Sequence, residues 1–314
     1  MKIVFPDVID LLERDRQRIQ ALGDVTFYED LPEDEAEVLR RIQGAEAIAP
    51  SWIDVTADLL SQVAALRYIV VPAVGYDQVD VAAASAAGIA VINCPTHNAL
   101  AVAEYTMGLI FAVTRGILTA NRNLLSGEWN PRVYKGMEVQ GKTLVMIGYG
   151  TIGRAVERLA TTLGMQVQWA TSRTAPEDLD CLIASADILS LHLPLTPQTR
   201  HLLDERRLNL MKPSAYLINT ARGAIVDQQA LLRSLQERRI AGAALDVFEN
   251  EPVTGKPSAE ILALSQLENV VATPHIAYNS HETVVRLGEE LVQNLQACIK
   301  GNPINVVNRE NLNN

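Results

Sequence analysis

The chain alternates short apolar runs with longer segments in which apolar residues recur at helical spacing. Strands are predicted in the first hundred residues at Ile3–Phe5, Val25–Tyr28, Ala45–Ala49, Tyr68–Val71 and Ile89–Asn93. The segments between them, such as Val8–Leu22 and Glu33–Gln43, mix charged and apolar residues at a helical period. This alternation of strand and helix is typical of a mostly parallel sheet covered by helices.

The same pattern restarts in the second part of the chain, after a helical segment expected from about 99 to 125. Further strands are predicted at Lys142–Ile147, Val167–Ala170, Ile188–Leu191, Ala215–Asn219, Gly242–Asp246 and Val270–Thr273. A last helix is expected from Glu282 to Lys300, because leucines recur there every four residues and Gly301 supplies a stop. We therefore predict an α/β fold of two doubly wound parallel-sheet lobes with a cleft between them.

Composition narrows the class of protein. The 314 residues contain 27 Lys and Arg against 37 Asp and Glu, a net charge of −10, which argues against nucleic acid or an anionic membrane as the partner. The three cysteines form no CxxC pair, and no HExxH spacing is present, so neither a disulfide framework nor a metal site is expected. The N-terminus does not resemble a signal peptide, and no apolar stretch is long enough to span a bilayer. We expect a cytoplasmic protein.

A glycine-rich turn is the first sign of chemistry. Gly148, Gly150 and Gly153 form a GxGxxG that follows a predicted strand and opens a predicted helix, with Thr151 and Ile152 between them. In this context the glycines permit a tight turn, close approach of a pyrophosphate, and packing of the helix on the strand. The helix N-terminus then offers N–H groups to the phosphates. The alternative is a strand–helix turn without a ligand.

The end of the following strand bears on the choice of dinucleotide. NAD-binding folds place a carboxylate there to bind the ribose hydroxyls. This chain instead has Ser172, Arg173 and Thr174 after Trp169. An arginine can pair with a 2′-phosphate that a carboxylate would repel. We predict a preference for NADPH; the alternative is that Arg173 is a solvated surface charge and NADH is used.

Three polar side chains follow later strands. Arg222, Glu251 and His275 each lie just beyond a predicted strand, at the edge where ligands bind in open α/β sheets. An arginine can clamp a carboxylate, a histidine can transfer a proton near neutral pH, and a glutamate can orient the imidazole. Each residue alone also has a structural explanation, but the set downstream of the glycine turn favours a catalytic one.

With these motifs in place, the chain resembles the D-isomer-specific 2-hydroxyacid dehydrogenases over nearly its whole length. The matching stretches are Val74–Asp77, Asn93–Glu104, the glycine turn, His192–Thr196, Met211–Leu231, and the motifs of Arg222, Glu251 and His275. The resemblance implies that Arg222 holds the substrate carboxylate, and that His275, paired with Glu251, donates the proton in reduction. It also implies a second carboxylate contact from the backbone at Val74 and Gly75.

The resemblance further assigns cofactor contacts and the organisation of the chain. Asp246 corresponds to the residue that faces the nicotinamide amide, and the cofactor is lined by Leu193, Thr220, Ala221 and Ala277. A substrate lobe is expected at residues 1–97 plus 287–314, with a Rossmann cofactor lobe at 98–286 inserted in it. Family members usually form homodimers through the cofactor lobe, and the helix near Ala101–Val113 is the candidate surface.

The activity implied is reversible hydride transfer between a nicotinamide dinucleotide and a small 2-oxo or 2-hydroxy acid. Glu251 argues against a formate dehydrogenase, and the segment Ala49–Trp52 lacks the arginine usual in phosphoglycerate dehydrogenases. The absence of an acidic residue after Trp169 resembles NADPH-dependent glyoxylate and hydroxypyruvate reductases. Two alternatives keep the same three residues: a dinucleotide-binding corepressor and an enzyme that oxidises phosphite.

Overall fold

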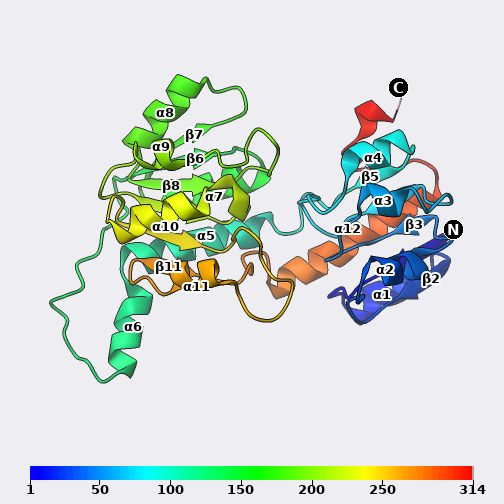
Figure 1. The fold of residues 1–314 in the computed structure, drawn as a ribbon, viewed down its shortest axis with the longest axis horizontal. Helices are drawn as coiled ribbons and strands as arrows, with labels where there is room; N and C mark the ends of the chain where they lie inside the picture. Colours follow the sequence, from blue (N-terminus) through cyan, green and yellow to red (C-terminus); the bar gives the residue numbers. More distant parts are fainter. Residues whose placement is uncertain (313–314) are drawn as a thin grey trace. The chain divides into compact units, whose positions relative to one another are not determined.

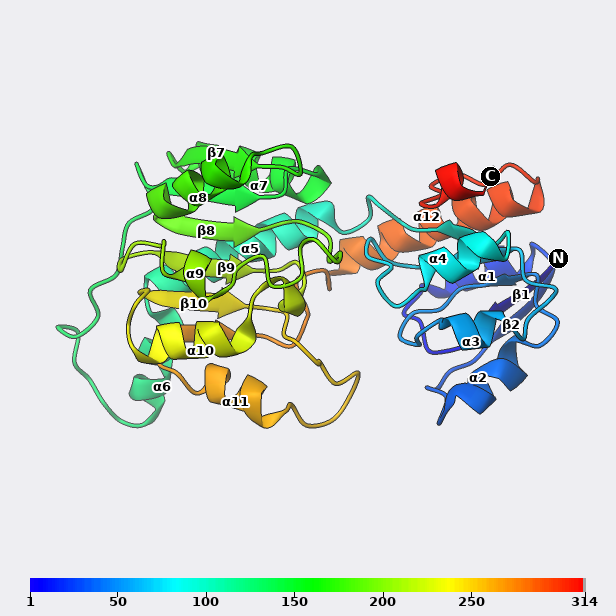
Figure 2. The same cartoon turned by 45° about the horizontal axis from the view of Figure 1, so that its top comes forward.

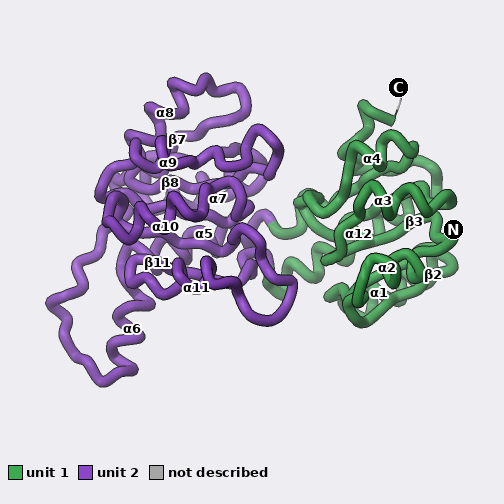
Figure 3. Tube along the Cα trace, in the orientation of Figure 1, with its two compact units in different colours: residues 1–98, 279–314 green, residues 99–278 purple. Residues whose placement is uncertain are grey.

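The computed structural model describes residues 1–312, which form two compact units. Unit 1 contains residues 1–98 and returns at Asn279, and unit 2 runs from Ala99 to Tyr278 (Figure 3). Each unit is built on one parallel sheet, so the prediction of two parallel-sheet α/β lobes is confirmed.

Unit 1 has a five-stranded sheet in the order β2-β1-β3-β4-β5 (Figure 1). Its strands are β1 Lys2–Phe5, β2 Asp24–Phe27, β3 Ala47–Ile48, β4 Tyr68–Val70 and β5 Ala90–Ile92. Its helices are α1 Glu13–Gln20, α2 Glu35–Ile42, α3 Ala57–Leu60, α4 Val81–Ala86 and α12 His281–Ile299, followed by the 3₁₀ turn η2 Arg309–Asn311. Alternate strand residues face opposite cores: Val4 packs toward the side of α2 to α4, and Ile3 toward α1 and α12.

Unit 2 has a six-stranded parallel sheet in the order β11-β10-β9-β8-β6-β7. Its strands are β6 Thr143–Ile147, β7 Gln166–Ala170, β8 Ile188–Leu191, β9 Tyr216–Asn219, β10 Gly242–Leu245 and β11 Val270–Ala272. Its helices are α5 Ala99–Thr114, α6 Ile117–Leu125, α7 Thr151–Thr162, α8 Pro176–Ser185, α9 Glu205–Leu208, α10 Gln228–Gln236 and α11 Ala259–Ser265, with the 3₁₀ turn η1 Gly223–Ile225. Figure 2 shows α9 and α10 on the opposite face of this sheet from α5.

Two of the predicted helices differ in the structure. The segment predicted as one helix from 99 to 125 is broken into α5 and α6, because Gly116 adopts a left-handed conformation (φ 60°) and the two helices meet at 61°. The first helix begins at Glu13 rather than Val8, since residues after Pro6 form a loop in which Asp7 accepts backbone hydrogen bonds from Ser51 to Ile53. Among residues 1–312 no single helix is both long and apolar enough to cross a membrane; only the bent α5–α6 pair meets that test jointly.

The boundary of the inserted unit also differs from the prediction. The chain re-enters unit 1 at Asn279, so the whole of α12 belongs there, whereas the family resemblance implied a return at residue 287. The helix is continuous from His281 because Ser280 caps its N-terminus, and its buried face, including Leu291 and Leu295, packs in the core of unit 1.

Candidate active site

The carboxyl edge of the unit 2 sheet collects most of the predicted site. Because all six strands are parallel, their carboxyl ends emerge at the same edge. From neighbouring strands, this edge receives Gly148 after β6, Ser172 after β7, Leu193 after β8, Thr220 after β9 and Asp246 after β10. His275 follows β11, the last strand of the sheet. The structure therefore brings these sequence-predicted residues of unit 2 to one edge.

The glycine turn meets the requirements of a dinucleotide site. Gly148 has φ +99°, and a Cβ there would lie 2.1 Å from the carbonyl oxygen of His192, so only glycine fits. At Gly153 a Cβ would lie 2.7 Å from the carbonyl oxygen of Gly148, while at Gly150 it would meet nothing within 4 Å. Gly150 is also the N-cap of α7, and no side chain caps this helix. The first N–H groups of α7 thus remain open to a phosphate, with room for its approach at Gly150.

The loop after β7 is a tight, exposed turn. The Thr171 N–H donates to the Thr174 hydroxyl at 2.9 Å, and the Thr174 N–H donates to the Thr171 carbonyl at 3.0 Å. Ser172 and Arg173 are exposed at the tip of this turn. Beside it, Trp169 stacks on Tyr149 of the glycine turn, with ring centroids 4.3 Å apart. The side chains of the turn are accessible to a ligand that lies along the sheet edge.

His275 and Glu251 form a hydrogen-bonded pair. His275 Nδ1 lies 2.7 Å from Glu251 Oε2, and the other carboxylate oxygen, Oε1, accepts the Phe248 N–H at 2.6 Å. The Glu251 carboxylate is therefore held in place by its own loop. With Nδ1 engaged, Nε2 is the ring nitrogen left for a substrate, and the His275 side chain is 38% exposed. His275 has φ 54°, an uncommon backbone conformation for a non-glycine residue.

Asp246 anchors the segment that carries His275. It is fully buried and accepts hydrogen bonds from the Thr273 hydroxyl (2.5 Å), the Ile276 N–H (3.0 Å) and the Ala277 N–H (2.8 Å). Its backbone carbonyl also accepts the His275 N–H at 2.7 Å. Burial raises the pKa of the Asp246 carboxyl, although these hydrogen bonds oppose the shift. Sequence reasoning missed this positioning role, because no spacing rule links position 246 to 273–277.

Arg222 lies at the end of β9, on a backbone fixed by its neighbours. Asn219 Nδ2 donates to the Arg222 carbonyl at 2.9 Å, and the Asn219 Oδ1 accepts the Ala221 N–H at 3.0 Å. The next residue, Gly223, touches the loop that leads to Glu251: a Cβ there would lie 1.9 Å from the carbonyl carbon of Phe248. Sequence reasoning did not single out Asn219 or Gly223. The sequence signal that could have found them is the Asn-x-x-Arg-Gly pattern. Its structural reason is the contact between the Arg222 loop and the loop that leads to Glu251.

The remaining predicted residues lie at several levels of burial. Ala277 is buried, Leu193 packs against the core, and the Thr220 hydroxyl lies 3.1 Å from that of Thr106 on α5. Val74 and Gly75 are half-buried in unit 1, in the loop after β4, where Asn93 Nδ2 donates to the Val74 carbonyl at 2.8 Å.

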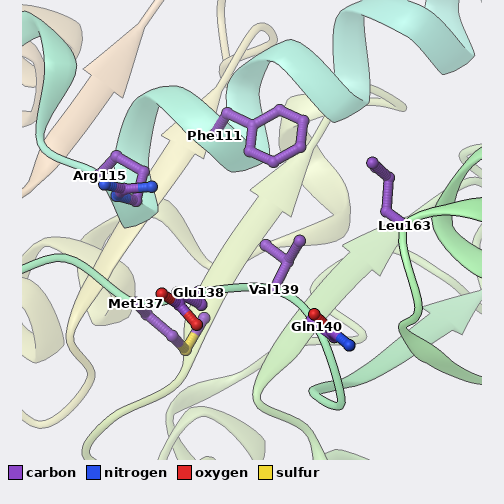
Figure 4. A pocket seen from close by; sticks show the side chains of 7 residues that line it. All are labelled: Phe111, Arg115, Met137, Glu138, Val139, Gln140 and Leu163. Carbon is purple, nitrogen blue, oxygen red and sulfur yellow. The ribbon is translucent and has the colours of Figure 1, made fainter.

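A separate cavity lies at the opposite edge of the unit 2 sheet. It measures about 320 Å³ and is lined by residues that precede β6 and β7 or end α5 (Figure 4): Phe111, Arg115, Met137, Glu138, Val139, Gln140 and Leu163. None of the sequence-predicted site residues lines it. Among residues 1–312, no group of three or more His, Cys, Asp or Glu side chains is placed to hold a metal ion.

Comparison with known proteins identifies the family. Residues 107–277 match the NAD-binding domain of the D-isomer-specific 2-hydroxyacid dehydrogenases. The chain is 39% identical over 306 residues to a glyoxylate reductase of Thermofilum pendens, covering 91% of this chain and 89% of that protein. The chain therefore belongs to the D-isomer-specific 2-hydroxyacid dehydrogenase family. It is an NAD(P)H-dependent oxidoreductase of that family. Small 2-oxo acids are substrates consistent with the names of its reductase relatives.

Two solved structures are similar over nearly the whole chain. An acyclic imino acid reductase in complex with NADPH and D-Arg has a TM-score of 0.89 and 33% identity, covering 98% of this chain and 100% of that one. The NADPH-dependent glyoxylate/hydroxypyruvate reductase of Sinorhizobium meliloti, in complex with NADP and malonate, has a TM-score of 0.84 and 29% identity, covering 98% and 96%. Both confirm the two-lobed parallel-sheet fold.

Proposed function

We propose that this protein is an NADPH-preferring reductase of small 2-oxo acids, of the glyoxylate and hydroxypyruvate type. The observation that carries the proposal is the His275–Glu251 pair at 2.7 Å, at the same sheet edge as Arg222 and the glycine turn. A proton donor is needed because reduction of a carbonyl to a hydroxyl consumes a proton. The relatives named glyoxylate reductase and glyoxylate/hydroxypyruvate reductase support the substrate class.

The dinucleotide is held by residues of unit 2. The N–H groups at Gly150, Thr151 and Ile152 take the pyrophosphate. Leu193, Thr220, Ala221, Asp246 and Ala277 line the rest of the cofactor site. Bound there, the reduced nicotinamide supplies the hydride for the carbonyl carbon.

The chain's own side chains bind the acid and move the proton. Arg222 binds the substrate carboxylate, with the backbone of Val74 and Gly75 in unit 1 as the second contact. His275 donates from Nε2 to the developing alkoxide, since its Nδ1 is bound to Glu251. Glu251 keeps the ring oriented, because its carboxylate is bonded to Nδ1. The positive charges of Arg222 and His275 stabilise the oxygen as it becomes negative.

The preference for NADPH rests on the turn after β7. Arg173 is exposed at its tip beside the hydroxyls of Ser172 and Thr174, and no carboxylate follows Trp169. A 2′-phosphate gains a charge-assisted bond there, whereas NADH gains none.

A homodimer is also proposed, through a segment that we call the arm, residues 117–136. The expected surface, Ala101–Val113, lies in α5, where residues such as Met107 and Ile110 are buried in the core of unit 2. The arm instead extends away from the rest of unit 2 (Figure 1) and exposes large apolar side chains. They are Ile117, Leu124, Leu125, Trp129 and Val133, each at least half exposed. A second copy that covers them would remove this surface from water.

The test of this function is a set of initial rates of reduced-nicotinamide oxidation. Glyoxylate, hydroxypyruvate, pyruvate and a bulkier 2-oxo acid are each assayed with NADPH and with NADH. We expect turnover, with kcat/KM for NADPH at least about tenfold above NADH. Absence of turnover with every acid, despite dinucleotide binding, would refute the proposal and favour a dinucleotide-sensing protein or phosphite oxidation.

The Arg173 interpretation has its own test. Arg173→Ala is expected to raise the KM for NADPH at least about tenfold and to leave the KM for NADH nearly unchanged, since only NADPH carries the 2′-phosphate. Arg158→Ala, which removes an exposed arginine on α7, is the control. Equal effects of Arg173→Ala on both dinucleotides would contradict the role.

A further inference from the structure

The loop after β10 carries a second paired glutamate, Glu249, two residues before Glu251. Arg200 Nη1 donates to Glu249 Oε1 at 2.8 Å, and His201 Nε2 lies 3.3 Å from the same oxygen. Arg200 and His201 both belong to the segment between β8 and α9, which leaves the carboxyl edge of the sheet. The Glu249 carboxylate therefore joins the loop that follows β8 to the loop that follows β10.

The loop that carries Arg200 and His201 is itself firmly held. The Arg200 N–H donates to the Thr196 carbonyl at 3.0 Å and closes a turn. Beyond His201, which has φ 51°, the chain enters the core of unit 2 at Leu203, a fully buried residue whose N–H donates to the Ile225 carbonyl at 3.1 Å. Side chains on a fixed backbone lose less conformational entropy when they pair, so this contact holds its acceptor better than a pair on two free segments.

The same loop also contacts the turn that carries Arg222. The His201 N–H donates to the Ala224 carbonyl at 2.8 Å. Ala224 lies in the 3₁₀ turn η1, which begins directly after Arg222. His201 therefore contacts the Arg222 turn through its backbone and the loop of Glu251 through its side chain, so the two loops of the proposed site share one support.

The backbone between the two glutamates passes on the position of the first to the second. Asn250, the residue between them, has φ 58°, and such a conformation persists where the surrounding structure fixes it. At Gly223 a Cβ would lie 2.4 Å from the Glu249 nitrogen, and the Glu249 N–H donates to Gln228 Oε1 at 3.0 Å. Glu249 is thus held through its backbone and its side chain, directly before the turn that leads to Glu251.

We infer that Glu249 is a positioning residue that aims the Glu251 carboxylate at His275. The inference rests on the proposed function, in which His275 donates the proton of the reduction. The Glu249 side chain is 23% exposed and that of Arg200 is 54% exposed, and an ion pair this accessible contributes little to stability. Its effect is on geometry, where a displacement of about 1 Å at a reacting group can cost about a hundredfold in rate.

The first test measures turnover and stability together. Glu249→Ala is expected to lower kcat at least about tenfold, with the 2-oxo acid that the unaltered protein reduces fastest. The KM for NADPH and the midpoint of urea unfolding should stay nearly unchanged. Glu205→Ala is the matched control, because Glu205 also pairs with two arginines of unit 2, Arg233 and Arg239, and lies on α9. A wild-type kcat in folded Glu249→Ala would overturn the inference.

The second test shows whether Glu249 acts through Glu251. In a protein that already carries Glu251→Gln, adding Glu249→Ala should change kcat less than about twofold, because the carboxylate that it positions is absent. Single-turnover measurements of NADPH oxidation follow these slow variants. A merely structural role would lower kcat by the same factor in both backgrounds, and that result would overturn the inference.

The outcomes distinguish this inference from the proposed function. If the unaltered protein reduces no 2-oxo acid, the proposed function fails and this inference fails with it. If the unaltered protein is active and Glu249→Ala keeps its kcat, only this inference fails. Should Glu249→Ala not fold, Glu249→Gln takes its place, since it keeps the size of the side chain and removes its charge. The expected loss in kcat is then at least about threefold, and a wild-type kcat would overturn the inference.

Discussion

At the scale of single residues, the site depends on side chains held by backbone groups. Glu251 is fixed by the Phe248 N–H and Asp246 by two N–H groups of the segment that carries His275. Preorganised donors and acceptors cost no reorganisation when charge develops during a reaction. In the proposed function the chemistry rests on His275 and Arg222, and the positions of these loops are fixed by buried neighbours such as Asp246.

The role of His275 can be tested directly. His275→Ala is expected to lower kcat for 2-oxo acid reduction at least about a hundredfold, because the general acid is removed. Steady-state rates at saturating substrate measure this, with folding checked by circular dichroism. His281→Ala, at an exposed histidine that begins α12, should retain activity. A near-normal kcat in folded His275→Ala would contradict the role of His275 as proton donor.

His192 should make stability depend on pH. Burial lowers the pKa of His192 from 6.5 to about 4. Between these two pH values the unfolded chain binds a proton at this residue and the folded chain does not. Stability is then lost as pH falls from about 6.5 to 4, by roughly 3 kcal/mol. Urea unfolding across this range should show a flatter pH dependence in His192→Gln than in the unaltered protein. His281→Gln is the exposed control, and an unchanged slope in His192→Gln would contradict the prediction.

At the scale of elements, the strand–turn–helix of β6 and α7 shows two different uses of glycine. Gly148 is required by the fold, because a Cβ would lie 2.1 Å from the carbonyl oxygen of His192. Gly150 is not required by the fold, because a Cβ there meets nothing within 4 Å. The open space at Gly150 is the place where a phosphate can approach the helix N-terminus.

A pair of alanine variants separates these uses. Gly148→Ala is expected to lower the free energy of unfolding by at least about 2 kcal/mol, from backbone strain and the clash with His192. Gly150→Ala should keep its stability and lose at least about tenfold in dinucleotide affinity, since its methyl group occupies the space for the pyrophosphate. Urea unfolding and isothermal titration calorimetry with NADPH measure the two effects. Normal dinucleotide affinity in Gly150→Ala would argue against a phosphate at this turn.

At the scale of the whole molecule, the arm is a segment whose large apolar side chains are not covered by the rest of unit 2. Trp129 is 84% exposed and Leu125 is 80% exposed, on a segment that extends away from the sheet. Exposed apolar side chains of this size gathered on one segment mark an interaction site. Because the proposed partner is a second copy, the contact is between like surfaces.

Charge placed on the arm should therefore disrupt the dimer. Trp129→Glu is expected to raise the dissociation constant of the dimer at least about a hundredfold, because burying an unpaired carboxylate is costly. Sedimentation velocity over a range of concentrations measures the mass. Val253→Glu, at another half-exposed apolar residue of unit 2, should leave the dimer intact. A monomer in the unaltered protein, or a dimer unaffected by Trp129→Glu, would refute the proposed interface.

The sequence by itself determined the repeating β–α order, the helix Thr151–Thr162 and the family, because these depend on local periodicity and on contiguous motifs. The tertiary structure decided what depends on contacts between distant segments. It placed the return of the chain at Asn279, joined Asp246 to the segment of His275, and packed Gly223 beneath Phe248. Periodicity records which face of an element is buried, whereas the partners of a buried polar group are known only when the chain is folded.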